Sequence, residues 1–195
     1  MSLMPITAII LAGGQSSRMN RQNKGLQLLH GNPLYYHVIN KIKPQVNHIV
    51  INCNQDIEQY QKSGYPVIVD ELIGFLGPLA GIFSGLITSS TDWNLVVSCD
   101  TPFLPDDLVK RLQAHCDTHL AAYVFDGEKS HPTLMLIHRQ LAPMIKHYLL
   151  QGKRKLLGFL QQIDAIQVDF SDKPDVFINI NTLEQLAYWN QKQCK

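Results

Sequence analysis

Two adjacent glycines and two basic residues near the start of the chain could form a phosphate-binding loop. Leu11-Ala12-Gly13-Gly14 ends a run of apolar residues, and Arg18 and Lys24 follow within a few positions. Glycines let the backbone turn sharply and present its N–H groups, and each charge-assisted hydrogen bond to phosphate could contribute roughly 1.5–3 kcal/mol. A tight strand-to-helix turn with solvated basic residues would use the same residue types. The patterns G-x-x-x-x-G-K-[ST] and G-x-G-x-x-G are absent, which excludes a P-loop and a dinucleotide fingerprint.

Asp100 follows another apolar run and precedes Thr101-Pro102, so it is predicted to lie where a buried strand ends. Open α/β sheets bind ligands at the carboxyl ends of their strands. One carboxylate there suits Mg²⁺, which prefers one or two protein oxygens together with waters and substrate phosphates. Asn181 could supply a further oxygen. Both residues also have a structural alternative, since an aspartate can cap a turn and an asparagine can cap the last helix.

Further residues fall on the same predicted edge of the sheet. Asn52 and Asp70 end the second and third predicted strands, so their side chains could face a ligand or simply close turns. Gly77-Pro78-Leu79-Ala80-Gly81 precedes a helical pattern, and its glycines permit a close approach of backbone to ligand. On residue types alone this last segment is only a turn.

The histidines and cysteines carry weaker signals. His115 and His119 have the spacing of a helical metal pair, but no third ligand is nearby, and a solvated helix end is the preferred interpretation. His131 begins a strand pattern, where a role in a hairpin and a place near a ligand explain it equally well. The four cysteines form no C-x-x-C pair and are expected to be reduced and structural.

The composition is that of an ordinary globular protein. The 195 residues are 45% hydrophobic and 17% charged, and 17 basic against 16 acidic side chains leave a net charge of +1. We therefore expect one domain over residues 1–195, with no overall field that would attract nucleic acid or a membrane. No apolar run approaches the roughly 18 residues that span a bilayer, and the start lacks the pattern of a signal peptide. A cytoplasmic location is the expectation.

Alternating strand and helix patterns predict an α/β fold with a mostly parallel central sheet and helices on both faces. A short link across Asp126-Gly127-Glu128 predicts a hairpin and therefore one antiparallel strand. Thr182 is the expected N-cap of the last helix. The predicted strands are Ile6–Leu11, His48–Cys53, Pro66–Val69, Asn94–Cys99, Ala121–Phe125, Thr133–His138 and Ile166–Phe170. The predicted helices are residues 34–42, Gly81–Thr88, Leu108–Cys116, Gln140–Leu150, Lys155–Leu160 and Leu183–Gln193.

The first loop also carries a family resemblance. Leu11-Ala12-Gly13-Gly14-Gln15-Ser16-Ser17-Arg18-Met19 followed by Lys24-Gly25 resembles the signature of nucleotidyltransferases that join a nucleoside monophosphate to a phosphorylated acceptor and release pyrophosphate. Among these enzymes the chain is most similar to the molybdenum cofactor guanylyltransferases, from the first strand to the final helix. The other matching motifs are Lys24-Gly25-Leu26, Ile51-Asn52-Cys53-Asn54, Gly77-Pro78-Leu79-Ala80-Gly81, Cys99-Asp100-Thr101-Pro102, His131-Pro132-Thr133 and Asn179-Ile180-Asn181-Thr182.

The resemblance implies a single-domain, Rossmann-like fold and a Mg²⁺-dependent transfer of GMP from GTP to the terminal phosphate of molybdopterin. It implies GTP, molybdopterin and proteins that deliver or accept the cofactor as partners. It assigns catalysis to Arg18, Lys24 and Asp100, and the metal to Asp100 with Asn181. It assigns nucleotide contacts to Leu11, Ala12, Gly13, Gly14, Lys24, Asn52, Asp70, Pro78, Gly81 and Asp100, with Asn179 and Asn181 beside them. The alternatives are a cytidylyltransferase or a sugar- or polyol-phosphate nucleotidyltransferase of the same fold, and a nucleotide-binding protein without catalysis.

Two positions depart from the family pattern. Members commonly have a glycine where this chain has Asn20 and an acid where it has Asn23. The loop between Arg18 and Lys24 is therefore expected to be less tightly turned and less acidic than usual, with both basic residues retained.

Overall fold

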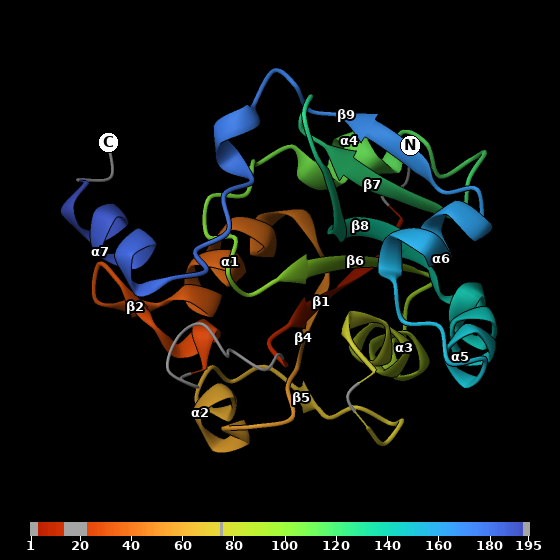
Figure 1. Ribbon diagram of the computed structural model, residues 1–195, viewed down its shortest axis with the longest axis horizontal. Helices are drawn as coiled ribbons and strands as arrows, with labels where there is room; N and C mark the ends of the chain where they lie inside the picture. The colour runs from red at the N-terminus through yellow and green to blue at the C-terminus, as the bar shows by residue number, and fades with distance from the viewer. Residues whose placement is uncertain (1–3, 14–22, 75, 193–195) are drawn as a thin grey trace.

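A seven-stranded sheet runs through the centre of the protein (Figure 1). The computed structural model describes residues 4–13, 23–74 and 76–192. The strand order is β5-β4-β1-β6-β8-β7-β9, in which β8 runs antiparallel to both neighbours and the other pairs are parallel. The strands are β1 (Ile6–Leu11), β4 (His48–Asn52), β5 (Val67–Ile68), β6 (Trp93–Ser98), β7 (Ala121–Phe125), β8 (Ser130–His138) and β9 (Ile166–Asp169). The mostly parallel sheet and the predicted hairpin are therefore confirmed.

The register of the central strands brings their carboxyl ends into one line. Leu11 at the end of β1 lies opposite Asn52 of β4 on one side and Ser98 of β6 on the other. Because parallel strands end at the same edge, the loops that follow these three strands must surround a common space. This edge carries most of the residues that the sequence singles out.

Helices cover both faces of the sheet, and alternate side chains of β1 point to opposite cores. Ala8 and Ile10 pack on the face covered by α1 (Leu34–Ile42) and α4 (Leu108–Gln113). Ile9 packs on the other face, under α3 (Pro78–Thr88), α5 (Ala142–Leu150) and α6 (Leu156–Gln162). Each of the two fully buried isoleucines contributes about 1.5–3 kcal/mol of transfer free energy, so the buried strand holds both layers together.

Smaller elements complete the structure beside the first face. The short hairpin of β2 (Leu28–Leu29) and β3 (Asn32–Pro33) and the helix α2 (Ile57–Gln61) follow no pattern long enough to be predicted. The terminal helix α7 (Leu183–Gln191) begins as expected, with the Thr182 side chain accepting from the backbone of Gln185 in a capping box. None of the helices in the described parts of the chain has the length and apolar character needed to cross a bilayer.

The predicted boundaries shift where local chemistry differs from hydrophobic periodicity. Helix α3 starts at Pro78 rather than Gly81, because Gly77 adopts a positive φ of 73° and proline suits the first helical turn. Helix α4 ends at Gln113 rather than Cys116. Strand β8 begins at Ser130 rather than Thr133.

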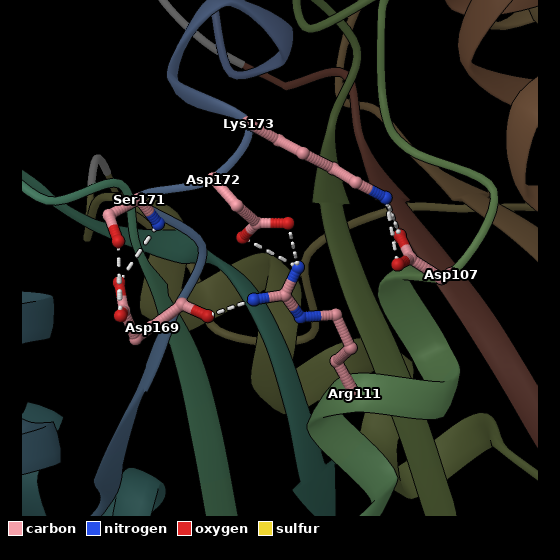
Figure 2. A network of polar contacts seen from close by, with 6 residues as sticks. All are labelled: Asp107, Arg111, Asp169, Ser171, Asp172 and Lys173. Carbon is pink, nitrogen blue, oxygen red and sulfur yellow. Dashed lines mark hydrogen bonds and ion pairs between the residues drawn. The ribbon is translucent and has the colours of Figure 1, made fainter.

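A surface network anchors the segment that follows β9 to helix α4, as Figure 2 shows. The Arg111 guanidinium donates to both carboxylate oxygens of Asp172, at 2.9 and 3.0 Å, and to the backbone oxygen of Asp169. It also lies over the ring of Phe170, 3.9 Å from its centroid. Lys173 Nζ donates to Asp107 at 2.8 Å, and this hydrogen bond lowers the pKa of the Asp107 carboxyl.

Replacing Arg111 with alanine should therefore destabilise the protein. The substitution removes the paired hydrogen bonds and the contact with Phe170, so we expect the free energy of unfolding to fall by about 1–2 kcal/mol in a denaturant titration, allowing for partial screening by solvent. The matched control is Lys110→Ala, an exposed position on the same helix, which should change stability by less than about 0.5 kcal/mol. Equal effects of the two substitutions would show that the network adds nothing.

Candidate active site

A cavity of about 270 Å³ opens at the carboxyl ends of β1, β4 and β6. It is bounded by the loop after β1, the turn around Lys24, the start of α3 and the loop after β6. The residues that line it are Leu11, Ala12, Gly13, Asn23, Lys24, Asn52, Asp70, Gly77, Pro78, Gly81, Ser98, Cys99, Asp100 and Thr133. This is the switch-point edge at which open α/β sheets bind ligands.

One end of the cavity holds a lysine between two oxygen-bearing side chains. Lys24 Nζ donates to Asn181 Oδ1 at 2.7 Å and lies 3.7 Å from Asp100 Oδ2. The other Asp100 oxygen accepts a hydrogen bond from Ser98 Oγ at 2.5 Å. The N–H of Ile180 donates to the backbone oxygen of Asp100 at 2.9 Å, which fixes the segment that carries Asn181. Residues from the start, middle and end of the chain thus converge on one ammonium group.

This donor set fits a hard divalent cation. Asp100 and Asn181 offer one carboxylate and one amide oxygen, and both already face a positive charge in the form of the Lys24 ammonium. Mg²⁺ needs few protein ligands because waters and substrate phosphates complete its shell. Asp100 is 6% exposed, so a cation or phosphate there would be shielded from bulk water. The described residues contain no group of three or more histidine, cysteine or acidic side chains that could hold a metal alone.

The other end of the cavity holds a network of two amides around one carboxylate. Asn52 Nδ2 donates to Asp70 Oδ1 at 3.0 Å, and Asn54 Nδ2 donates to Asp70 Oδ2 at 2.8 Å. The backbone N–H of Asp70 returns a hydrogen bond to Asn54 Oδ1 at 2.9 Å. A carboxylate has room for about four hydrogen bonds, so Asp70 can still accept N–H groups from a ligand.

Gly81 explains how Asn52 fits beneath helix α3. A β-carbon at Gly81 would overlap the side-chain oxygen of Asn52, which is only 2% exposed. The glycine therefore serves a close approach of helix to strand end, with its backbone beside the cavity. The close approach that the structure shows at this glycine is to Asn52, and an approach to a ligand stays a prediction.

The loop after β1 is described only as far as Gly13. The N–H of Ala12 donates to the backbone oxygen of Asn52 at 2.8 Å, so it extends the sheet and is not a bare donor. Gly13 packs against Asn54, whose side-chain nitrogen would lie 3.2 Å from an added β-carbon. Gly14, Arg18 and Asn20 lie outside the described residues.

Nine of the eleven described residues expected to contact the nucleotide line the cavity: Leu11, Ala12, Gly13, Lys24, Asn52, Asp70, Pro78, Gly81 and Asp100. Asn181 reaches it through Lys24, and the capping alternative for Asn181 is wrong because Thr182 caps the helix. Asn179 is half-buried and is not among the lining residues. Asn23 and Ser98 also line the cavity, and the sequence does not predict either as a site residue. Asn23 acts through partners that are remote in sequence, and Ser98 lies within a strand pattern.

Thr133 lines the cavity because strand β8 bulges. Val124 of β7 lies opposite His131, whereas Tyr123 lies opposite Met135, so the residues between are displaced from the ladder. Bulges re-aim side chains beside active sites, and the proline in His131-Pro132-Thr133 is the sequence signal for one. The bulged residue Thr133 therefore turns toward the cavity.

His131 itself is held within the hairpin. Its Nε2 lies 2.7 Å from Asp126 Oδ2, and its ring lies 5.5 Å from that of Phe177. Burial opposes ionisation of Asp126, but hydrogen bonds from His131 and from two backbone N–H groups outweigh it and lower the pKa of that carboxyl to about 2. The structural explanation for His131 is thereby supported.

Two of the described cysteines, Cys53 and Cys99, behave as small apolar residues. Cys53 and Cys99 are free and buried in the core under the sheet. Burial, reinforced by Asp56, raises the pKa of Cys53 to about 11, and burial raises that of Cys99 well above its ordinary range. Such thiols stay protonated and unreactive at neutral pH.

A second cavity of about 590 Å³ adjoins the first and shares Ala12, Gly13, Asn23, Asp70 and Gly77 with it. Its far wall is apolar, formed by Leu72, Ile73, Gly74 and Leu76. Together the two spaces offer a charged end at Lys24, an amide and carboxylate patch at Asp70, and an apolar rim.

Comparison with known proteins agrees with this arrangement. The family model of the MobA-like NTP transferase domain matches residues 8–166. A molybdenum cofactor guanylyltransferase of Yersinia pestis (strain Pestoides F) is 48% identical over 188 residues, which cover 96% of each chain. The crystal structure of molybdopterin-guanine dinucleotide biosynthesis protein A from Archaeoglobus fulgidus has a TM-score of 0.78 at 22% identity, covering 95% of this chain and 97% of that one.

A further structural neighbour shows how widely this fold is used. The 4-diphosphocytidyl-2C-methyl-D-erythritol synthase of Anaerococcus prevotii has a TM-score of 0.75 at 14% identity, over 96% of this chain and 95% of that one. At such identities the structural matches establish the fold, whereas the family match and the 48% identity establish membership of the family. The chain belongs to the MobA-like NTP transferase family, among its molybdenum cofactor guanylyltransferases, and is a nucleotidyltransferase.

Proposed function

We propose that this protein transfers GMP from GTP to the terminal phosphate of molybdopterin, which yields the guanine dinucleotide cofactor and pyrophosphate, and that residues 1–195 act as one catalytic domain. The observation that carries the proposal is the cavity with Lys24 and Asp100 at one end, where Asn181 binds Lys24, and with Asn52 and Asp70 at the other. A 48% identical guanylyltransferase supports the choice of base and acceptor.

The reaction requires no general base in this proposal. A phosphate monoester loses its second proton near pH 6, so the acceptor is already largely anionic at neutral pH. The obstacles are repulsion between that anion and the α-phosphate of GTP, and the charge that builds on departing pyrophosphate. Lys24 and Arg18 would neutralise this charge, and Asn181 and Asp100 already hold the Lys24 ammonium beside the cavity.

Asp100 and Asn181 are the proposed ligands of Mg²⁺. A Mg²⁺ ion held by these two side chains would supply positive charge next to the substrate phosphates. Ser98 holds one Asp100 oxygen and leaves the other directed toward Lys24, so the carboxylate has a defined orientation before ligands arrive.

Asp70 is proposed to recognise the base of the nucleotide. Neutral guanine presents N–H donors at neighbouring positions 1 and 2, which suit the two oxygens of one carboxylate. Asn52 and Asn54 hold those oxygens in place from the protein side. A site built to accept hydrogen bonds rejects bases that lack the donors, because its carboxylate would be left unpaired.

The proposed partners are GTP, molybdopterin and the proteins that deliver or accept the cofactor, and the proposed location is the cytoplasm. Nothing in the net charge of +1 favours nucleic acid as a partner.

A panel of nucleotides should separate GTP from the alternatives. With Mg²⁺ present, GTP at 100 times its dissociation constant should stabilise the protein by about 2.7 kcal/mol, and CTP, ATP and UTP at the same concentration should stabilise it less. The shift in unfolding temperature measures this. A larger shift with CTP would favour a cytidylyltransferase.

Pyrophosphate release that requires molybdopterin would distinguish the enzyme from a nucleotide-binding protein and from enzymes with sugar or polyol acceptors.

Asp100→Asn should lower the rate of pyrophosphate release by about 100-fold or more with Mg²⁺, since it keeps the shape of the side chain but removes its charge. The matched control is Asp106→Asn, whose side chain is 84% exposed and pairs with Lys41 on the surface. The control should retain normal turnover. Near-normal turnover by Asp100→Asn would disprove the assignment of the metal.

Lys24→Ala should reduce kcat/KM by an amount equivalent to about 2–4 kcal/mol, because its ammonium would no longer contact the triphosphate. Lys41→Ala provides the comparison, as it removes an exposed lysine away from the cavity. If both variants had the wild-type kcat/KM, Lys24 would have no place in the mechanism.

A further inference from the structure

The turn that carries Lys24 rests on three side chains from outside the proposed catalytic set. Asn23 caps the short 3-10 turn Lys24–Leu26, and its Oδ1 accepts from the N–H of Gly25 at 3.2 Å. The same oxygen accepts from the hydroxyl of Tyr60 at 2.6 Å. Asn23 Nδ2 donates to Asp56 Oδ2 at 3.1 Å. Both the oxygen and the nitrogen of the amide are therefore engaged by the protein, immediately before the lysine.

These contacts allow only one orientation of the Asn23 amide. The backbone N–H of Gly25 can only donate, so the amide oxygen must face it. An ionised carboxylate can only accept, so the amide nitrogen must face Asp56. A carboxylate in place of the amide would bring two like charges together, about 3 Å apart by the present geometry. In this chain a neutral residue at position 23 is thus matched to the acid at position 56.

Burial holds one partner of Asn23, and backbone hydrogen bonds hold the main chain of the other, whose side chain is exposed. Tyr60 is fully buried, and any β-carbon at Gly25 would overlap its hydroxyl, so the backbone of the turn lies directly on the tyrosine. Asp56 has a positive φ of 53°, and its backbone oxygen accepts from Gln59 and Tyr60 at the start of α2. Helix α2 therefore offers a donor from Tyr60, and the residue before the helix offers an acceptor, on the side that faces Asn23.

We propose that Asn23 is a positioning residue for the triphosphate site. It acts through Lys24, and it depends on the match between its amide donor and acceptor and the groups of Asp56 and Tyr60. The network sets the start of the turn, and the turn sets where the Lys24 ammonium meets Asn181 and Asp100. The inference rests on the proposed role of Lys24 in binding phosphates and is independent of the base and of the acceptor.

The test exchanges the two side chains. Asn23→Asp should weaken the binding of Mg²⁺ with inorganic triphosphate, measured by calorimetry, by roughly tenfold. The double variant Asn23→Asp with Asp56→Asn has the net charge of the wild type and restores one donor facing one acceptor, so its affinity should return to within about threefold of the wild type. Inorganic triphosphate carries no base, so a protein that used CTP or another acceptor would still show this pattern. A nucleotide panel without a preference for GTP would contradict the proposed substrate but not this inference.

Two controls separate positioning from charge and from folding. Gln59→Glu adds a negative charge on the same helix, where it can still accept from Lys62, and should bind triphosphate as the wild type does. In a Lys24→Ala background, Asn23→Asp should cause less than about a twofold further loss, because no lysine remains to be misplaced. Unfolding temperatures of all variants show whether any loss reflects global destabilisation.

A crystal structure of Asn23→Asp provides a second, independent measurement. The Lys24 ammonium should leave Asn181 in this variant and return to it in the exchanged pair. The inference is overturned if Asn23→Asp binds triphosphate as the wild type does, if the exchange fails to rescue binding, or if Lys24 keeps its place in the variant.

Discussion

One ammonium group links parts of the chain that are far apart in sequence. Lys24 joins the turn after the first loop to Asn181, which is 157 positions away, and to Asp100 at the end of β6. Hydrogen bonds of this kind are strong only when both partners arrive in fixed positions. The architecture can be understood as the means of fixing them: the sheet holds Asp100, helix α2 supports the turn of Lys24, and the segment after β9 delivers Asn181.

The sheet contributes through register more than through any single side chain. Because β1 is paired with β4 and β6 so that Leu11, Asn52 and Ser98 share one row, the loops that follow these three strands begin at the same level along the strand direction. Asp100 and Asp70 then reach opposite ends of one cavity. A shift of one residue in either pairing would turn these side chains to the other face of the sheet, which the two apolar cores prevent.

The two ends of the cavity suit different parts of a nucleotide. The end at Lys24 combines positive charge with oxygen ligands, which favours phosphates and a divalent cation. The end at Asp70 combines a carboxylate with amides, which favours recognition of N–H donors. The glycine at position 81 permits this arrangement, since a larger residue in helix α3 would displace Asn52.

The sequence by itself determined the class of fold, the parallel strands with one antiparallel member and the cap at Thr182. These features depend on hydrophobic periodicity and turn chemistry, which neighbouring residues specify. The family resemblance, and not a local pattern alone, indicated most residues of the cavity. Only the tertiary structure decided that Asn181 binds Lys24 instead of capping a helix, that the N–H of Ala12 belongs to the sheet, and that Asn23 faces Asp56 and Tyr60. Those outcomes depend on partners tens of residues away, whose distance and direction are set by register and packing, and no local pattern contains that information.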